Sequence, residues 1–205
     1  MDYEVILFDF DGVLCEDYFY NNLLEHYPHV SEYIQTKIFR GNSDIPDLWM
    51  KNIMSMNDVN KHISDNTGIE LKLLSNLFEE SVKNMKINKG LLSIASQLKK
   101  QGRKIALVTN NMDVFDKITV PHNTLHEVFP IIINSCNYGV LKHEENGKLF
   151  DIVMGKLGHT EYNKVLLIDD SKKARETFEK KGGKTFAYST FDEFYLRAKN
   201  NLSIQ

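Results

Sequence analysis

Cysteine is scarce in this chain of 205 residues, which has only Cys15 and Cys136, far apart in the sequence. Two distant cysteines build neither the disulfide framework of a small secreted domain nor the clustered ligands of a zinc site. A run of about 20 apolar residues, the length needed to cross a bilayer, is also missing. The start of the sequence has no secretory signal pattern. We therefore expect a cytoplasmic protein with no membrane partner.

The sequence also lacks a strong excess of charge of one sign. Its 25 Lys and Arg residues stand against 28 Asp and Glu residues, and no segment concentrates the basic ones. Proteins that bind nucleic acid gather basic side chains into a patch that contacts phosphates, so we expect no nucleic-acid partner. The 42% hydrophobic and 26% charged residues are typical of a soluble globular protein. The length allows one core domain and a smaller insert.

Short apolar runs are present at intervals and predict buried β-strands. The four clear runs are Val5–Phe8, Ile105–Val108, Ile131–Ile133 and Val165–Ile168, and Thr185–Tyr188 is a weaker fifth. Strands that are apolar on both faces are typical of a parallel sheet covered by helices on each side. Helical patterns separate the runs, for example over residues 91–98 and 172–181. This alternation predicts a doubly wound α/β sheet, built from residues 1–14 and 87–205.

Residues 15–86 interrupt that alternation. They contain no convincing strand and show helical patterns, notably over residues 59–63 and 71–82. We therefore predict a helical domain inserted directly after the first strand. The aromatic residues in and beside it, Tyr18, Phe19, Tyr20 and Trp49, are expected to pack in a core, with substrate contact as the alternative.

Polar residues follow three of the four clear strands. Asp9 and Asp11 follow the first, Thr109-Asn110 the second and Asp169-Asp170 the last. Because ligands bind at the carboxyl ends of strands in an open parallel sheet, we expect these side chains to share one site.

The carboxylates of this site predict a metal ion and a reaction. Asp9 and Asp11 are two residues apart in an extended segment, so both side chains point to one side. Carboxylates this close stay ionised only beside a cation, and Mg²⁺ prefers oxygen ligands and binds phosphate. A carboxylate can attack phosphorus, and a second one can protonate the leaving oxygen. The pattern predicts cleavage of a phosphate ester through an aspartyl-phosphate.

These segments resemble the motifs of the haloacid dehalogenase (HAD) superfamily. The segment Asp9–Leu14 is similar to the first motif, Leu107–Asn111 to the second and Leu167–Ser171 to the fourth. The position and helical character of the insert resemble the helical-cap subclass of the family.

The resemblance implies a role for each matching residue. Asp9 is expected to be the nucleophile and Asp11 the general acid and base. Thr109 and the backbone amide of Asn110 are expected to bind the transferring phosphoryl group. The implied metal ligands are Asp9, the backbone carbonyl of Asp11 and Asp170, with Asp169 as a supporting or second ligand.

The third motif of the family supplies a lysine that neutralises phosphate charge. Gly139–Lys142 resembles this motif, although His143 stands where proline is usual. Lys142 is therefore the expected lysine and Lys148 the alternative. The family often has another Asp or Asn after the fourth-motif acid, whereas residues 172–175 here read Lys-Lys-Ala-Arg. Asp169 is the candidate to take its place.

The implied activity is a magnesium-dependent phosphatase that acts on a small phosphorylated metabolite, such as a sugar phosphate. A phosphomutase resembling β-phosphoglucomutase shares both aspartates and remains the main alternative. A 2-haloacid dehalogenase is a further alternative. That reaction needs neither magnesium nor an acid two residues after the nucleophile, so the presence of Asp11 argues against it. The last alternative is a non-catalytic protein that binds a phosphorylated ligand. The presence of Asp9, Asp11, Thr109 and Asp170 together argues against it.

Overall fold

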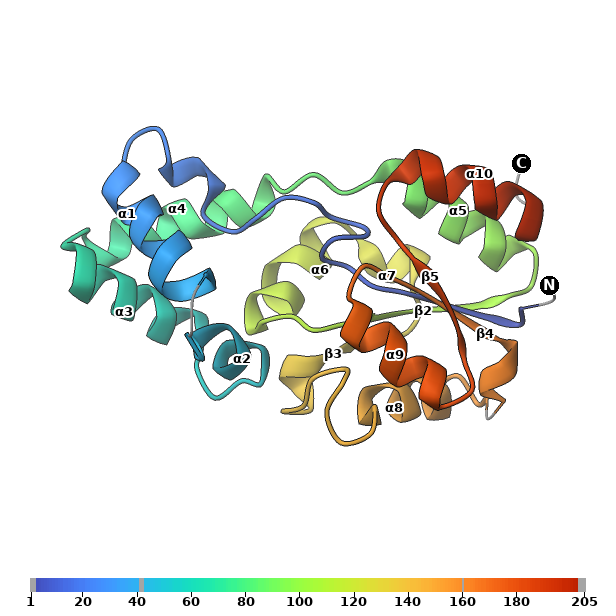
Figure 1. Ribbon diagram of the computed structural model, residues 1–205. Coiled ribbons are helices and arrows are strands. Elements are labelled where there is room, and N and C mark those ends of the chain that lie inside the picture. Colours follow the sequence, from blue (N-terminus) through green and yellow to red (C-terminus); the bar gives the residue numbers. More distant parts are fainter. Residues whose placement is uncertain (1–2, 41–42, 160, 203–205) are drawn as a thin grey trace.

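The computed structural model describes residues 3–40, 43–159 and 161–202. Its centre is a five-stranded sheet in the order β3-β2-β1-β4-β5, and all neighbouring strands are parallel (Figure 1). The strands are β1 (Val5–Phe8), β2 (Lys104–Thr109), β3 (Ile132–Asn134), β4 (Val165–Asp169) and β5 (Lys184–Ala187). The predicted doubly wound α/β fold is confirmed, including the weak fifth strand.

Helices cover both faces of the sheet. Successive strand residues point to opposite sides, and the strands carry apolar side chains on both of them. Ile6 and Phe8 of β1 belong to the core on one face, together with α5 (Lys89–Lys100) and α10 (Phe191–Asn201). Val5 and Leu7 belong to the core on the other face, with α8 (Lys148–Lys156) and α9 (Lys172–Lys180). The short helices α6 (Val120–His122) and α7 (Leu125–Val128) lie on the same face as α5.

A group of helices lies beyond the carboxyl end of the sheet (Figure 1). It consists of η1 (Asn21–Leu23), α1 (Pro28–Tyr33), η2 (Ile34–Phe39), α2 (Ile45–Met50), α3 (Met56–Thr67) and α4 (Leu71–Lys83). We call it the helical region. Cys15 and Ile87, where the chain leaves and re-enters the sheet domain, pair through an isolated β-bridge. The two chain segments that connect the sheet domain to the helical region therefore lie side by side.

Local sequence accounts for the clearest helix boundaries in this region. Ser55 and Asp58 form a reciprocal capping box at the start of α3, and Gly68 ends the helix at a φ of 76°. Trp49 and Tyr20 are buried as expected, and both rings contact Phe78. Tyr18 does not follow that expectation. It is 78% exposed, because its side chain lies at the mouth of the pocket described below.

No helix among the described residues is both long enough and apolar enough to cross a membrane.

Candidate active site

The carboxyl ends of β1, β2 and β4 meet at one edge of the sheet. Phe8 pairs with Leu107 on one side and Ile168 on the other, so the residues after these positions emerge together. The chain turns sharply after β1 at Gly12, which has a φ of 75°. A Cβ at Gly12 would lie 2.3 Å from an Asp170 carboxylate oxygen. Glycine is required there both for the turn and for the close approach of Asp170.

Lys142 joins two buried carboxylates at this edge. Its Nζ lies 2.5 Å from Asp9 Oδ2 and 2.7 Å from Asp169 Oδ2. All three side chains are almost fully buried, so each charge depends on the others for compensation. Burial raises the pKa of Asp9, Asp169 adds to the rise and Lys142 opposes it. Burial alone would lower the pKa of Lys142, but the two carboxylates raise it above the ordinary value, and the lysine stays charged.

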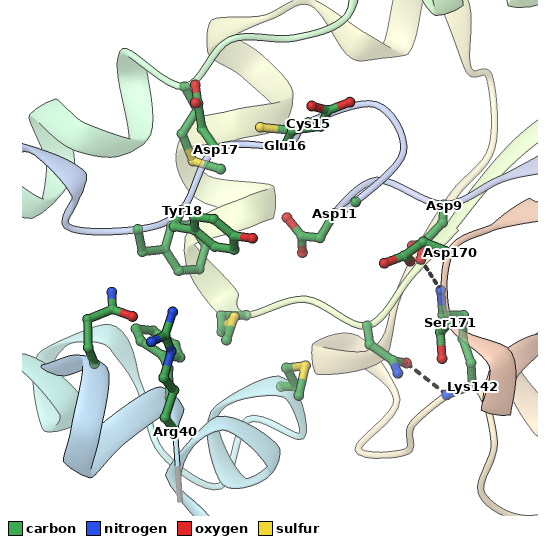
Figure 2. Close-up of a pocket in the computed structure, with 18 residues that line it drawn as sticks. Asp9, Asp11, Cys15, Glu16, Asp17, Tyr18, Arg40, Lys142, Asp170 and Ser171 are labelled. Carbon is green, nitrogen blue, oxygen red and sulfur yellow. Dashed lines mark hydrogen bonds and ion pairs between the residues drawn. The ribbon is translucent and has the colours of Figure 1, made fainter. Parts of the chain in front are cut away.

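The two candidate lysines have different surroundings. Lys142 lies among the strand-end carboxylates. Its backbone N–H donates to Asn110 Oδ1 at 2.8 Å, one of the contacts dashed in Figure 2. Lys148 is half exposed at the start of α8 and pairs with Glu145 at 2.7 Å. Residues 144–147 form a short loop that separates the two lysines.

Asp169 and Asp170 are adjacent but differ in access. Both Asp169 oxygens have partners, since Oδ2 accepts from Lys142 and Oδ1 accepts the Ser171 N–H at 2.8 Å. Asp170 is exposed and lines the pocket. Partial burial of its carboxyl group raises its pKa, and Asp169 raises it further. Together with Asp9, these residues offer oxygen atoms that all lie within 4.8 Å of one another. Such a group of hard oxygen donors fits Mg²⁺.

Asp11 projects into the pocket and receives a hydrogen bond that the sequence did not reveal. Asn111 Nδ2 donates to Asp11 Oδ2 at 2.8 Å. Asn111 is itself fixed, because its N–H donates to Ser135 Oγ and its Oδ1 accepts from Met112 N. Burial raises the pKa of Asp11 to about 7, Lys142 opposes the rise and Asp170 adds to it. A carboxyl group with a pKa near neutrality can both donate and accept a proton.

Thr109 ends β2 and is fully buried. Within the described part of the chain, its Oγ1 has no hydrogen-bond partner. A buried hydroxyl without a partner is costly, and such groups in native proteins call for an explanation. An oxygen of a bound phosphoryl group would satisfy it.

A pocket of about 730 Å³ opens above these residues (Figure 2). Its floor includes Asp9, Asp11, Lys142 and Asp170, which come from the sheet domain. The helical region contributes Gln35, Phe39, Arg40 and Met50, and Phe19, Met85 and Met112 add further apolar surface. The site therefore lies between the sheet and the helical region.

Direct contacts among the described residues join the helical region to the sheet domain near this pocket. Trp49 Nε1 donates to Asp113 Oδ1 at 2.7 Å, and Ser135 Oγ donates to the Met50 carbonyl at 2.8 Å. Lys51 pairs with Glu144 at 2.5 Å, and Glu144 also accepts the N–H of Leu141, next to Lys142. Sequence patterns missed these contacts, since each joins segments more than 60 residues apart.

Comparison with solved structures supports the same fold. A structure described as a predicted HAD-like family hydrolase from Porphyromonas gingivalis has a TM-score of 0.78 at 18% identity, with both chains fully covered. A HAD family enzyme from Bacteroides thetaiotaomicron, in complex with magnesium and inorganic phosphate, has a TM-score of 0.71 at 17% identity. That comparison covers 94% of this chain and 99% of the other.

Sequence comparison gives a shorter match and a family. Bifunctional epoxide hydrolase 2 of Rattus norvegicus is 31% identical over 101 residues, which are 47% of this chain but only 18% of the rat protein. Residues 3–173 match the family described as haloacid dehalogenase-like hydrolases. The match covers most of the chain, and the protein belongs to the haloacid dehalogenase-like hydrolase family.

Proposed function

We propose that the protein is a phosphatase that uses Mg²⁺ and hydrolyses a small phosphorylated metabolite. The observation that carries this proposal is the meeting of Asp9, Asp11, Lys142 and Asp170 on the floor of one pocket. Two carboxylates with different surroundings can divide the work of nucleophile and proton donor. A haloacid dehalogenation has no use for a proton donor at Asp11, so the raised pKa of Asp11 favours phosphoryl transfer.

Asp9 is the nucleophile in this proposal. One of its carboxylate oxygens attacks phosphorus, and the bond from phosphorus to the leaving oxygen breaks. Asp11 in its protonated form donates a proton to that oxygen. In the second step, Asp11 as a carboxylate takes a proton from water, which attacks phosphorus and releases phosphate and free Asp9.

The remaining residues bind and neutralise the phosphoryl group. Lys142 offsets the negative charge that gathers when phosphate meets Asp9, and Asp169 fixes the lysine in place. The unpaired Thr109 hydroxyl and the backbone amide of Asn110 donate hydrogen bonds to phosphoryl oxygens.

The proposed magnesium ligands are Asp9, Asp170 and the backbone carbonyl of Asp11. Asp169 has a supporting role, since it binds Lys142 beside them. When bound, the ion would neutralise charge on the phosphate and on the carboxylates around it. The clustered oxygens of Asp9, Asp169 and Asp170 support this assignment. The same ion and inorganic phosphate accompany the related Bacteroides thetaiotaomicron enzyme.

The helical region is the proposed cap, formed by residues 15–86 and inserted into a core domain of residues 1–14 and 87–205. Its position over the strand ends supports a role in excluding water and selecting the substrate (Figure 1).

A phosphate-release assay over sugar phosphates, nucleotides, phosphoglycolate and phosphoserine tests the proposal. We expect release from at least one compound with Mg²⁺ and none after addition of EDTA. Analysis of the products separates hydrolysis from isomerisation, and a transferred phosphate without free phosphate would instead indicate a phosphomutase. No turnover of any compound with Mg²⁺ would contradict both activities.

A further inference from the structure

The side of the pocket formed by the helical region carries an arginine, Arg40, whose side chain has no partner among the described residues. Arg40 follows η2 and lines the pocket together with Gln35. Among the described residues, none forms a hydrogen bond or ion pair with the Arg40 guanidinium. Figure 2 shows this side chain across the pocket from Lys142 and Asp9. Its charge is available to a ligand that already occupies the catalytic end.

The pocket has room for such a ligand. Its volume is about 730 Å³, within the range of roughly 300–1,000 Å³ that holds whole small molecules. A phosphate group alone would fill only a small part of it. A substrate with a body that extends from the strand ends toward the helical region would therefore fit.

The walls indicate the chemistry of that body. Apolar side chains also line the pocket, namely Phe19, Phe39, Met50, Met85 and Met112. The acidic side chains of Glu16 and Asp17 lie on the opposite side of the pocket from Arg40 in Figure 2. Asp17 is also engaged, since it accepts the backbone N–H of Lys86. A negative group on the substrate is therefore attracted toward Arg40 and repelled from the other side.

We propose that the substrate carries a second anionic group, a carboxylate or a second phosphate, and that Arg40 binds it. A guanidinium group presents parallel N–H donors that match the paired oxygens of either anion. The inference rests on the proposed phosphatase activity, because the first phosphate anchors the substrate at Asp9. The substrate class is a phosphate monoester with a partly apolar body and an anion at its far end.

Three synthetic substrates with the same alkyl chain test this assignment. They are an alkyl phosphate, the same phosphate with a terminal carboxylate and the corresponding terminal bisphosphate. We expect kcat/KM of the wild type to be about tenfold higher or more for at least one compound with a second anionic group than for the plain alkyl phosphate. The compound that gains more distinguishes carboxylate from phosphate recognition.

Variants of Arg40 complete the test. In Arg40→Gln this preference should fall to near unity, mainly because KM rises for the compounds with a second anionic group. Lys37→Gln removes the same charge from η2 at an exposed position outside the pocket, and it should keep the preference. A wild-type preference near unity for both compounds with a second anionic group, or one that Arg40→Gln retains, would overturn the assignment while leaving the phosphatase proposal intact. If no alkyl phosphate and no compound of the wider panel is hydrolysed, the phosphatase proposal itself fails.

Discussion

Lys142 Nζ lies 2.5 Å from an oxygen of Asp9 and 2.7 Å from an oxygen of Asp169, and all three groups are shielded from solvent. The lysine therefore links the proposed nucleophile to a carboxylate that has no access to the pocket. Lys142 stabilises the fold by compensating buried charge, and the same charge serves phosphate binding in the proposed mechanism.

Replacing Lys142 with methionine should separate these two roles. The variant leaves buried carboxylates without a cation, so we expect a loss of about 3–5 kcal/mol in the free energy of unfolding, measured by urea denaturation. Adding Asp169→Asn to Lys142→Met should restore part of that stability but no phosphatase activity. Wild-type stability in the single variant would show that the buried charges are compensated in another way.

Asn111→Ala should reduce kcat more than it changes KM. Without the hydrogen bond from Asn111, Asp11 loses the contact that fixes its orientation. Misplacing a catalytic group can lower the rate by about 10- to 100-fold, and steady-state kinetics with Mg²⁺ measure this loss. Asn137→Ala is the matched control, because Asn137 is exposed and donates to Asp116 away from the pocket. Equal effects of the two substitutions would contradict a positioning role for Asn111.

The metal-free protein should lose stability as pH rises, in part because of Asp11. Burial raises the pKa of Asp11 from 3.8 to about 7, so the folded state holds a proton that the unfolded state releases. Folding is then disfavoured progressively from about pH 4 to about pH 7.

Urea denaturation in EDTA can isolate this contribution. The stability of Asp11→Asn relative to wild type should be higher at about pH 8 than at about pH 5, since the variant has no proton to lose. A stability difference that does not change with pH would mean that Asp11 titrates normally in the folded protein.

Glu144 offers a test of how the helical region influences the catalytic lysine. Its carboxylate binds Lys51 of the helical region and the Leu141 N–H beside Lys142. Glu144→Ala removes both contacts, whereas Lys51→Met removes only the first. We expect the alanine variant to lose several-fold more kcat/KM than Lys51→Met. Because the ion pair is partly exposed, its own effect on stability should be below about 1 kcal/mol. Equal kinetic losses would assign the whole effect to the Lys51 contact.

Local sequence patterns were enough to predict the sheet and the meeting of its polar strand ends. Short apolar runs that contain β-branched residues, such as Val165–Ile168, favour a buried strand, and parallel strands bring their carboxyl ends together. The pairing of Asn111 with Asp11 could not be predicted this way. It depends on how two loops that are 100 residues apart in the sequence are oriented toward each other. The periodicity of apolar residues carries no information on that orientation. The exposure of Tyr18 was missed for a similar reason, because an aromatic residue at a pocket mouth has the same local sequence signal as one in a core.

In the proposed mechanism, Asp9 forms a covalent bond to the transferred phosphoryl group. Its most direct measurement is peptide mass spectrometry after rapid acid quenching of the wild type during turnover with Mg²⁺. We expect a phosphoryl adduct on the peptide that contains Asp9, and neither an adduct nor phosphate release in a folded Asp9→Asn variant. Undiminished phosphate release by Asp9→Asn would contradict a role of Asp9 as the nucleophile.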